Sequence, residues 1–268
     1  MTQPATIRVP IRDGAELEVH AAGDGPVVLL VSGLGGTAGF WRPVVAGLAG
    51  CRVLTLDQRG IGASTRGTAP CTITTLAEDC LAVLDRLEVA RCVVVGHSTG
   101  GCIAMALTAH APDRIVGLGL SATWLRPNRY MGALFAAREA MLDSVPEAYA
   151  ALGTMLGHPA GWLDEHWAAY EAAVQQAPRT APARAIVRER IAALLGFDGS
   201  GLVGRLSAPA LILGAKDDLI VPYFLQQDLH NHLPAAAFAT FETGGHFFPV
   251  TQNAVFCARL REWIGGLA

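Results

Sequence analysis

One stretch of the sequence limits the possible folds more than any other: Val93-Val94-Val95-Gly96-His97-Ser98-Thr99-Gly100-Gly101. A β-branched run ends at Gly96, a serine follows within the pattern Gly-x-Ser-x-Gly, and the apolar segment 102–107 comes next. This order predicts a strand, a very sharp turn and a helix. A serine in such a turn adopts a strained backbone that lifts its hydroxyl clear of the sheet, and glycines beside it prevent clashes. The stretch therefore predicts Ser98 as a nucleophile, with an ordinary glycine-rich turn as the alternative.

The rest of the chain alternates short apolar runs with amphipathic segments, which is typical of a parallel sheet covered by helices. Strands are expected at residues 5–9, 15–21, 27–31, 51–56, 92–96, 115–120, 210–213 and 237–242. Helices are expected between them at residues 40–49, 73–88, 99–110, 222–233 and 251–266. Asp13-Gly14 indicates a hairpin between the first two strands. The predicted fold class is therefore α/β, with a mostly parallel eight-stranded sheet and helices on both faces.

The alternation stops after Thr123 and resumes near Ala208. In between, the sequence predicts helices and no strand, at residues 129–143, 146–156, 161–176 and 182–196, with a short one after Asp198. We expect a core domain made of residues 1–123 and 207–268, with residues 124–206 inserted as a helical cap.

Polar side chains directly after the predicted strands suggest a catalytic triad, because sites in parallel sheets form beyond the carboxyl ends of the strands. Ser98 follows one strand, Asp217 and Asp218 follow another, and His246 follows the last. A serine hydroxyl needs a base to remove its proton, and a carboxylate orients that base. We predict Ser98, His246 and Asp218 in these roles, with Asp217 as the alternative acid. His97 is expected to point away from the site.

Acyl transfer also needs donors for the negative oxygen of the tetrahedral intermediate, and backbone N–H groups supply them in a preformed position. Thr99 directly follows the nucleophile. Leu34 lies in the glycine-rich loop Ser32-Gly33-Leu34-Gly35-Gly36, after the first buried strand. We predict these two N–H groups as the oxyanion hole. A phosphate-binding loop is the alternative, but Gly-x-x-x-x-Gly-Lys-Ser/Thr is absent from the sequence.

Composition excludes several classes of function. The net charge of −3 gives no basic surface for nucleic acid, and no apolar run is long enough to span a membrane. The N-terminus lacks the pattern of a signal peptide, and the six cysteines form no C-x-x-C pair. We expect a cytoplasmic enzyme with reduced cysteines, no metal and no cofactor, acting on a small molecule. The oligomeric state is left open, with a homodimer as one option.

Several motifs together resemble the α/β-hydrolase superfamily, over nearly the whole chain from Val27 to Leu267. They are Ser-Gly-Leu-Gly-Gly at 32–36, Asp-Gln-Arg-Gly at 57–60, Gly-His-Ser-Thr-Gly at 96–100, Asp-Asp-Leu-Ile-Val-Pro at 217–222 and Gly-Gly-His at 244–246. The segment 124–206 stands where that superfamily has its cap. Many members have histidine where this chain has Ser32.

Within the superfamily, the loop at 31–36, the Asp-Gln-Arg-Gly motif and Trp124-Leu125-Arg126 resemble RutD-like aminoacrylate/carbamate hydrolases. This resemblance implies a small polar substrate with a carbamate or enamine C–N bond, and makes Arg126 a candidate partner for a carboxylate. Trp124 and Phe247 are further candidates for the substrate cavity. Enol-lactonases and small carboxylesterases are similar more generally. A hydrolase-fold ligand receptor, or a cofactor-free oxygenase or carbon–carbon hydrolase, are the competing functions.

Overall fold

A computed structural model describes residues 5–267. The strands are β1 (Ala5–Pro10), β2 (Glu16–Ala22), β3 (Val27–Val31), β4 (Arg52–Leu56), β5 (Cys92–His97), β6 (Ile115–Ser121), β7 (Ala210–Ala215) and β8 (Ala237–Phe241). They form one eight-stranded sheet in the order β1-β2-β4-β3-β5-β6-β7-β8. β1 and β2 pair antiparallel, β2 also pairs antiparallel with β4, and the other neighbours are parallel. The predicted fold class is confirmed.

Helices cover both faces of the sheet. They are η1 (Ala38–Trp41), α1 (Arg42–Gly47), α2 (Ile73–Arg86), α3 (Thr99–His110), η2 (Pro112–Arg114), α9 (Tyr223–His232), α10 (Phe248–Thr251) and α11 (Asn253–Gly265). The central strands are buried on both sides, and their side chains alternate between two cores. In β3, Leu29 and Val31 belong to the core that contains α2 and α3, whereas Val28 and Leu30 belong to the core with α1 and α11. This two-sided burial explains the wholly apolar sequence of β3.

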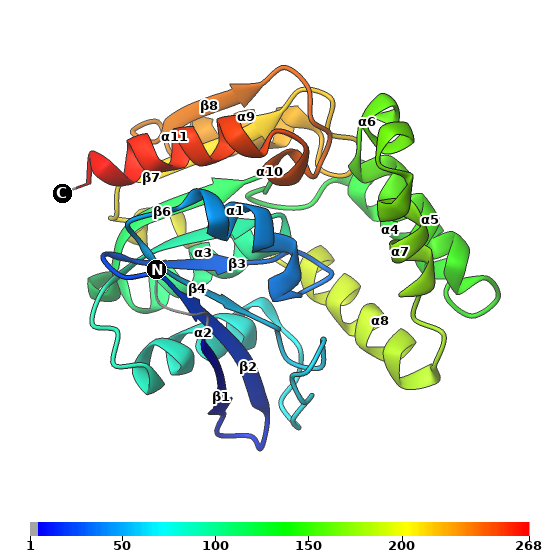
Figure 1. Ribbon diagram of the computed structural model, residues 1–268, viewed down its shortest axis with the longest axis horizontal. Coiled ribbons are helices and arrows are strands. Elements are labelled where there is room, and N and C mark those ends of the chain that lie inside the picture. The colour runs from blue at the N-terminus through cyan, green and yellow to red at the C-terminus, as the bar shows by residue number, and fades with distance from the viewer. Residues whose placement is uncertain (1–4, 268) are drawn as a thin grey trace.

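The residues between β6 and β7 form helices α4 (Arg129–Ala140), α5 (Pro146–Gly157), α6 (Ala160–Glu165), α7 (Trp167–Gln175), α8 (Ala181–Leu195) and η3 (Val203–Arg205). We refer to residues 124–206 as the cap segment. Figure 1 shows α4 to α8, in green and yellow-green, gathered at one side of the sheet domain. That side is the one toward which the β3 arrow points, so the cap segment lies at the carboxyl ends of the parallel strands.

One predicted helix of the cap segment is interrupted. The helix expected over 161–176 is two helices, α6 and α7, which meet at His166 with φ −121° and ψ 40°. The imidazole Nδ1 of His166 lies 2.8 Å from the carbonyl oxygen of Trp162, so the side chain caps the end of α6. The helix expected over 251–266 is present as α11, and the short helix α10, which was not expected, precedes it. Within the described residues, no helix has the length and apolarity needed to cross a membrane.

Candidate active site

Ser98 occupies the turn between β5 and α3, with a left-handed backbone at φ 57° and ψ −124°. This conformation is rare for a residue with a side chain. Glycines make the turn possible: a Cβ at Gly96 would collide with the carbonyl oxygen of Gly100, and a Cβ at Gly100 would collide with that of Val31. The local geometry is therefore that of a nucleophile elbow.

His246 and Asp218 lie against each other in the loops after β8 and β7. The imidazole Nδ1 of His246 is 2.8 Å from Oδ2 of Asp218, and both side chains are almost completely buried. The other oxygen of Asp218 accepts hydrogen bonds from the backbone N–H groups of Ile220 and Val221, each at 2.8 Å. These bonds fix the carboxylate, so it can hold the imidazole in one orientation.

Asp217, the alternative acid, points elsewhere. Its carboxylate accepts hydrogen bonds from the hydroxyl of Thr243 (2.7 Å) and from the N–H groups of Gly244 (3.0 Å) and Gly245 (2.9 Å). Asp217 thus shapes the loop that leads into His246. Asp218 therefore contacts His246, whereas Asp217 holds the backbone of the loop that precedes His246.

His97 lies closer to the site than its position in the sequence suggests. Its ring centroid is 4.8 Å from that of His246, and its Nδ1 is 3.1 Å from the hydroxyl of Ser121. Complete burial, with His246 nearby, lowers the pKa of the His97 imidazole well below its usual range. His97 also lines the cavity beside Ser98, so the expectation that it points away is wrong. The neutral imidazole of His97 packs against the imidazole of His246.

The glycine-rich loop after β3 runs directly beside the elbow. A Cβ added at Gly33 would lie 3.0 Å from Cβ of Ser98 and 3.4 Å from its Oγ, a tight fit that shows how closely the loop passes the elbow. Ser32 donates its hydroxyl to the carbonyl oxygen of Thr37 at 2.6 Å, which closes the loop. Leu34 lies in this loop, and Thr99 begins α3, so both predicted oxyanion donors belong to segments that border Ser98.

A buried arginine from the cap segment fastens this loop. Arg190 of α8 donates from Nε to the carbonyl oxygen of Leu34 (2.7 Å) and from Nη2 to that of Gly33 (3.0 Å). Nη2 also donates to Oε1 of Gln58 (2.5 Å), whose amide donates to the carbonyl oxygen of Ser32 (2.7 Å). Burial lowers the pKa of the Arg190 guanidinium. These hydrogen bonds thus link the cap segment to the loop that borders Ser98.

These elements enclose a cavity of about 620 Å³. Ser98, His97 and His246 line it, together with the glycine-rich loop around Leu34, the loop at 60–62 and residues of helices α4, α5, α7 and α8. Phe247, a predicted substrate contact, lines this cavity as well.

The two other predicted substrate contacts are not among the cavity's lining residues. Trp124 is completely buried in the hydrophobic core, whereas Arg126 is exposed beside Asp198. Both lie between the end of β6 and the start of α4, where Trp124 packs into the core and Arg126 reaches the surface.

Two features that the sequence did not single out contribute to the site: Arg138 and Tyr149, both in the cavity wall. Arg138 is the one cavity residue with a permanently charged side chain among those that the structure describes. Its helix carries three arginines or glutamates within 129–139, and helical spacing alone does not tell which of them faces a cavity.

Comparison with known proteins agrees with this geometry. The model of a family described as alpha/beta hydrolase fold matches residues 26–252. The chain belongs to this α/β-hydrolase family. The hydrolase is also 38% identical, over 251 residues, to a protein of Variovorax paradoxus (strain S110) named "Putative carbamate hydrolase RutD"; the match covers 92% of this chain and 94% of the relative. The predicted resemblance to RutD-like proteins is confirmed.

Solved structures share the fold of this hydrolase over nearly its full length. A hydrolase from Pseudomonas aeruginosa PA01 superimposes with a TM-score of 0.86 at 26% identity, covering 97% of this chain and 98% of that one. The enol-lactonase from Burkholderia xenovorans LB400 superimposes with a TM-score of 0.85 at 22% identity, covering 97% and 100%. At that identity, the second likeness concerns the fold alone.

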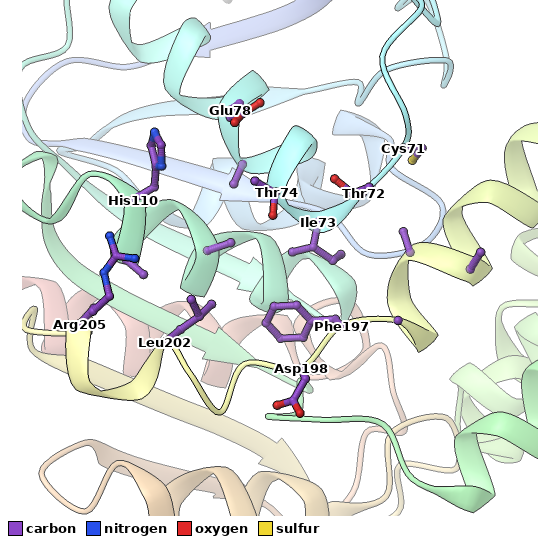
Figure 2. Close-up of a pocket in the computed structure, with 16 residues that line it drawn as sticks. Cys71, Thr72, Ile73, Thr74, Glu78, His110, Phe197, Asp198, Leu202 and Arg205 are labelled. Atoms are coloured by element: carbon purple, nitrogen blue, oxygen red, sulfur yellow. The ribbon is translucent and has the colours of Figure 1, made fainter.

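The hydrolase has a second cavity, of about 580 Å³, formed by α2, α3 and the residues between α8 and η3. Figure 2 shows its polar residues, Glu78, His110, Asp198 and Arg205, spread around the cavity rather than gathered at one point. All four are exposed. Ser98 and His246 are not among its lining residues, so the elbow opens onto the first cavity and not onto this one.

Proposed function

We propose that this hydrolase cleaves a small carbamate or ester through an acyl-enzyme formed on Ser98. The observation that carries the proposal is the strained Ser98 opening onto the same cavity as His246, whose imidazole is held by Asp218 at 2.8 Å. In the described part of the chain, the Ser98 hydroxyl has no hydrogen bond to His246. Catalytic hydrogen bonds are often long in a free enzyme and tighten with substrate, so this does not argue against the pair.

In the proposed reaction, Oγ of Ser98 attacks the substrate carbonyl carbon while Nε2 of His246 takes the hydroxyl proton. The carbonyl π electrons move to oxygen, which the N–H groups of Leu34 and Thr99 would stabilise. Collapse of this intermediate breaks the bond to the leaving group, which receives the proton from His246. Water then attacks the acyl-enzyme by the same route, releasing the acid and restoring Ser98.

Our choice of the bond that is cleaved is supported by the name of a similar protein. The relative from Variovorax carries the name carbamate hydrolase, and it shares 38% of its residues with this chain. We therefore place small carbamates first, with esters, enol-lactones and amides as substrates of the same chemistry. The cavity of about 620 Å³ suits molecules of this size.

The test compares the wild type with Ser98→Ala and with Ser207→Ala, a matched change at an exposed serine. Hydrolysis is measured over small carbamates, p-nitrophenyl esters of graded length and enol-lactones. We expect Ser98→Ala to lower kcat by about 10⁴-fold or more, with an unchanged circular dichroism spectrum. A fluorophosphonate should label the wild type and Ser207→Ala at Ser98, with loss of fluoride, and should leave Ser98→Ala unlabelled.

Two results would contradict the proposal. Turnover that survives Ser98→Ala would exclude Ser98 as the nucleophile. Tight binding of these compounds by the wild type, without turnover of any of them, would indicate a ligand receptor instead.

A further inference from the structure

The cavity beside Ser98 contains a buried cation. Arg138 extends from α4 into the cavity wall and is only 7% exposed. The other lining residues include no aspartate, glutamate or lysine. The wall around this guanidinium is therefore apolar or neutral, and its charge is not balanced from within the cavity.

The guanidinium also lacks the partners that a buried arginine normally has. Among the residues that the structure describes, its side chain forms neither a hydrogen bond nor an ion pair, and its Nε is buried without a partner. Arg59, which is equally deep in the protein, shows the usual solution. It bonds both oxygens of Asp79, at 2.7 and 2.6 Å, and Oδ2 of Asp13 at 2.7 Å. Leaving a buried cation unpaired is unfavourable, so an unpaired one suggests a missing partner.

The surroundings of Arg138 hold it in a defined position. Its guanidinium carbon lies 4.5 Å from the ring centroid of Tyr149 and 5.7 Å from that of Phe135. A Cβ at Gly153 of α5 would collide with Nη2, so a glycine provides the space that the group fills. Aromatic faces orient the planar cation but offer it no hydrogen-bond acceptor in its plane. The N–H donors stay available to a planar anion.

Arg190 is also buried without a carboxylate, but its situation differs. Three of its hydrogen bonds go to oxygen atoms of Gly33, Leu34 and Gln58, and it does not line the cavity. Its role is accounted for by the loop that it fastens. Burial lowers the pKa of the Arg138 guanidinium, because it disfavours the charged form. At Arg138 no hydrogen bonds like those of Arg190 offset this cost, whereas a bound anion would.

We propose that Arg138 binds a carboxylate carried by the substrate, so that the enzyme selects acyl compounds with a free carboxylate away from the bond that is cleaved. The inference rests on the proposed function for the cleavage itself. A guanidinium and a carboxylate form two parallel N–H···O hydrogen bonds, which fix orientation as well as charge. With the carboxylate on Arg138, the rest of the substrate extends through the cavity toward Ser98.

The first experiment measures specificity with matched esters. Hydrolysis of the monomethyl and dimethyl esters of succinate and of glutarate is followed at pH 7 by acid release. The monoester carries a carboxylate where the diester is neutral, and the acyl chains are the same. We expect the wild type to prefer the monoester in kcat/KM, and Arg138→Met to reduce that preference by about 10- to 100-fold, mainly through KM. Arg138→Lys should keep part of it, because it retains the charge but not the paired donors.

Arg129→Met is the matched control, since Arg129 belongs to the same helix, α4, but is exposed. It should leave the preference for the monoester as in the wild type. Equal losses on both esters in Arg138→Met would overturn the proposal and give Arg138 a structural role. An unchanged preference, or a shift of the same size in Arg129→Met, would overturn it as well.

The second experiment separates binding from cleavage. Titration calorimetry follows the binding of monomethyl glutarate to the Ser98→Ala protein and to Ser98→Ala/Arg138→Met. We expect the affinity for this monoester to fall at least tenfold in the double variant. If the wild type cleaves none of the esters but this loss is observed, the proposed function fails and the carboxylate site stands. If turnover occurs but the two affinities are equal, the carboxylate site fails and the proposed function stands.

Discussion

At the scale of single residues, the site depends on two adjacent aspartates with different tasks. Asp218 contacts the imidazole of His246, while Asp217 holds the backbone of the loop before it. Spacing in the sequence could not separate them with certainty, because both follow β7 and either could reach a histidine from the next loop. What decides is the direction of the chain after β7, where Oδ1 of Asp218 accepts the N–H groups of the following turn.

The two aspartates therefore predict unequal effects of the same substitution. Asp218→Asn should lower kcat by about 10⁴-fold on any substrate that the wild type cleaves, because an amide favours the wrong tautomer of His246. In Asp217→Asn, the amide oxygen can still accept some of the hydrogen bonds from the loop before His246. This substitution should therefore lower kcat by less than about tenfold. Steady-state kinetics of both variants checks this, and losses of similar size would contradict the assignment.

At the scale of elements, helix α8 of the cap segment reaches the glycine-rich loop after β3. Arg190 of α8 is 1% exposed and holds the carbonyl groups of Gly33 and Leu34. The orientation of those peptide groups sets where the N–H of Leu34 points. A helix far along the chain thus positions a predicted oxyanion donor.

Arg190→Gln should accordingly lower kcat by about 10- to 100-fold, with a smaller change in KM, because a displaced oxyanion donor weakens the transition state more than the bound substrate. Arg188→Gln is the control on the same helix, where the arginine is partly exposed and pairs with Asp143. Arg190→Lys should recover part of the rate. A loss confined to KM, or one matched by Arg188→Gln, would show that Arg190 only supports the cap segment.

Side-chain hydrogen bonds that end a helix could not be predicted from the sequence pattern. Apolar periodicity runs through residues 161–176 without a glycine or proline that would end a helix inside it. The interruption depends on the His166 side chain bonding the carbonyl oxygen of Trp162, an interaction that periodicity does not register. Arg138 was not predicted because the cavity that it faces forms only where α4 packs with other segments, such as α5 and α8.

At the scale of the whole molecule, the strand ends were predictable because parallel strands bring their carboxyl ends to one edge. Ser98, Asp218 and His246 are spread over about half of the chain, yet the alternation of strands and helices places them together. The position of the cap segment over that edge depends on packing between distant segments, which local sequence patterns do not encode. Its contributions to the cavity, Arg138 and Tyr149, therefore had to come from the structure.

The buried histidines make the stability of the whole fold depend on pH. Burial lowers the pKa of His97, and of His158, so the folded state keeps both imidazoles neutral while the unfolded chain takes up protons near pH 6.5. The unfolded state thus binds more protons as the pH falls through 6.5, and the free energy of unfolding must fall with it. Each neutral group contributes at most about 1.4 kcal/mol per pH unit.

Carboxylates act in a lower pH window. Although burial by itself raises the pKa of Asp13, hydrogen bonds from Ala69 and Arg59 lower it overall. The stability from such a group is complete above the unfolded pKa near 4 and is lost below it. Measurements between pH 7.5 and 5 therefore report mainly on the histidines.

We expect urea unfolding at pH 7.5, 6.5 and 5.5 to show a decreasing free energy of unfolding. In His97→Gln the decrease should be smaller by up to about 1.4 kcal/mol for each pH unit below 6.5, because the glutamine does not titrate. The control is His232→Gln at an exposed histidine, which should keep the wild-type slope. A wild-type stability that stays constant over this range, or a slope that His97→Gln leaves unchanged, would mean that His97 takes up a proton as readily in the fold as outside it.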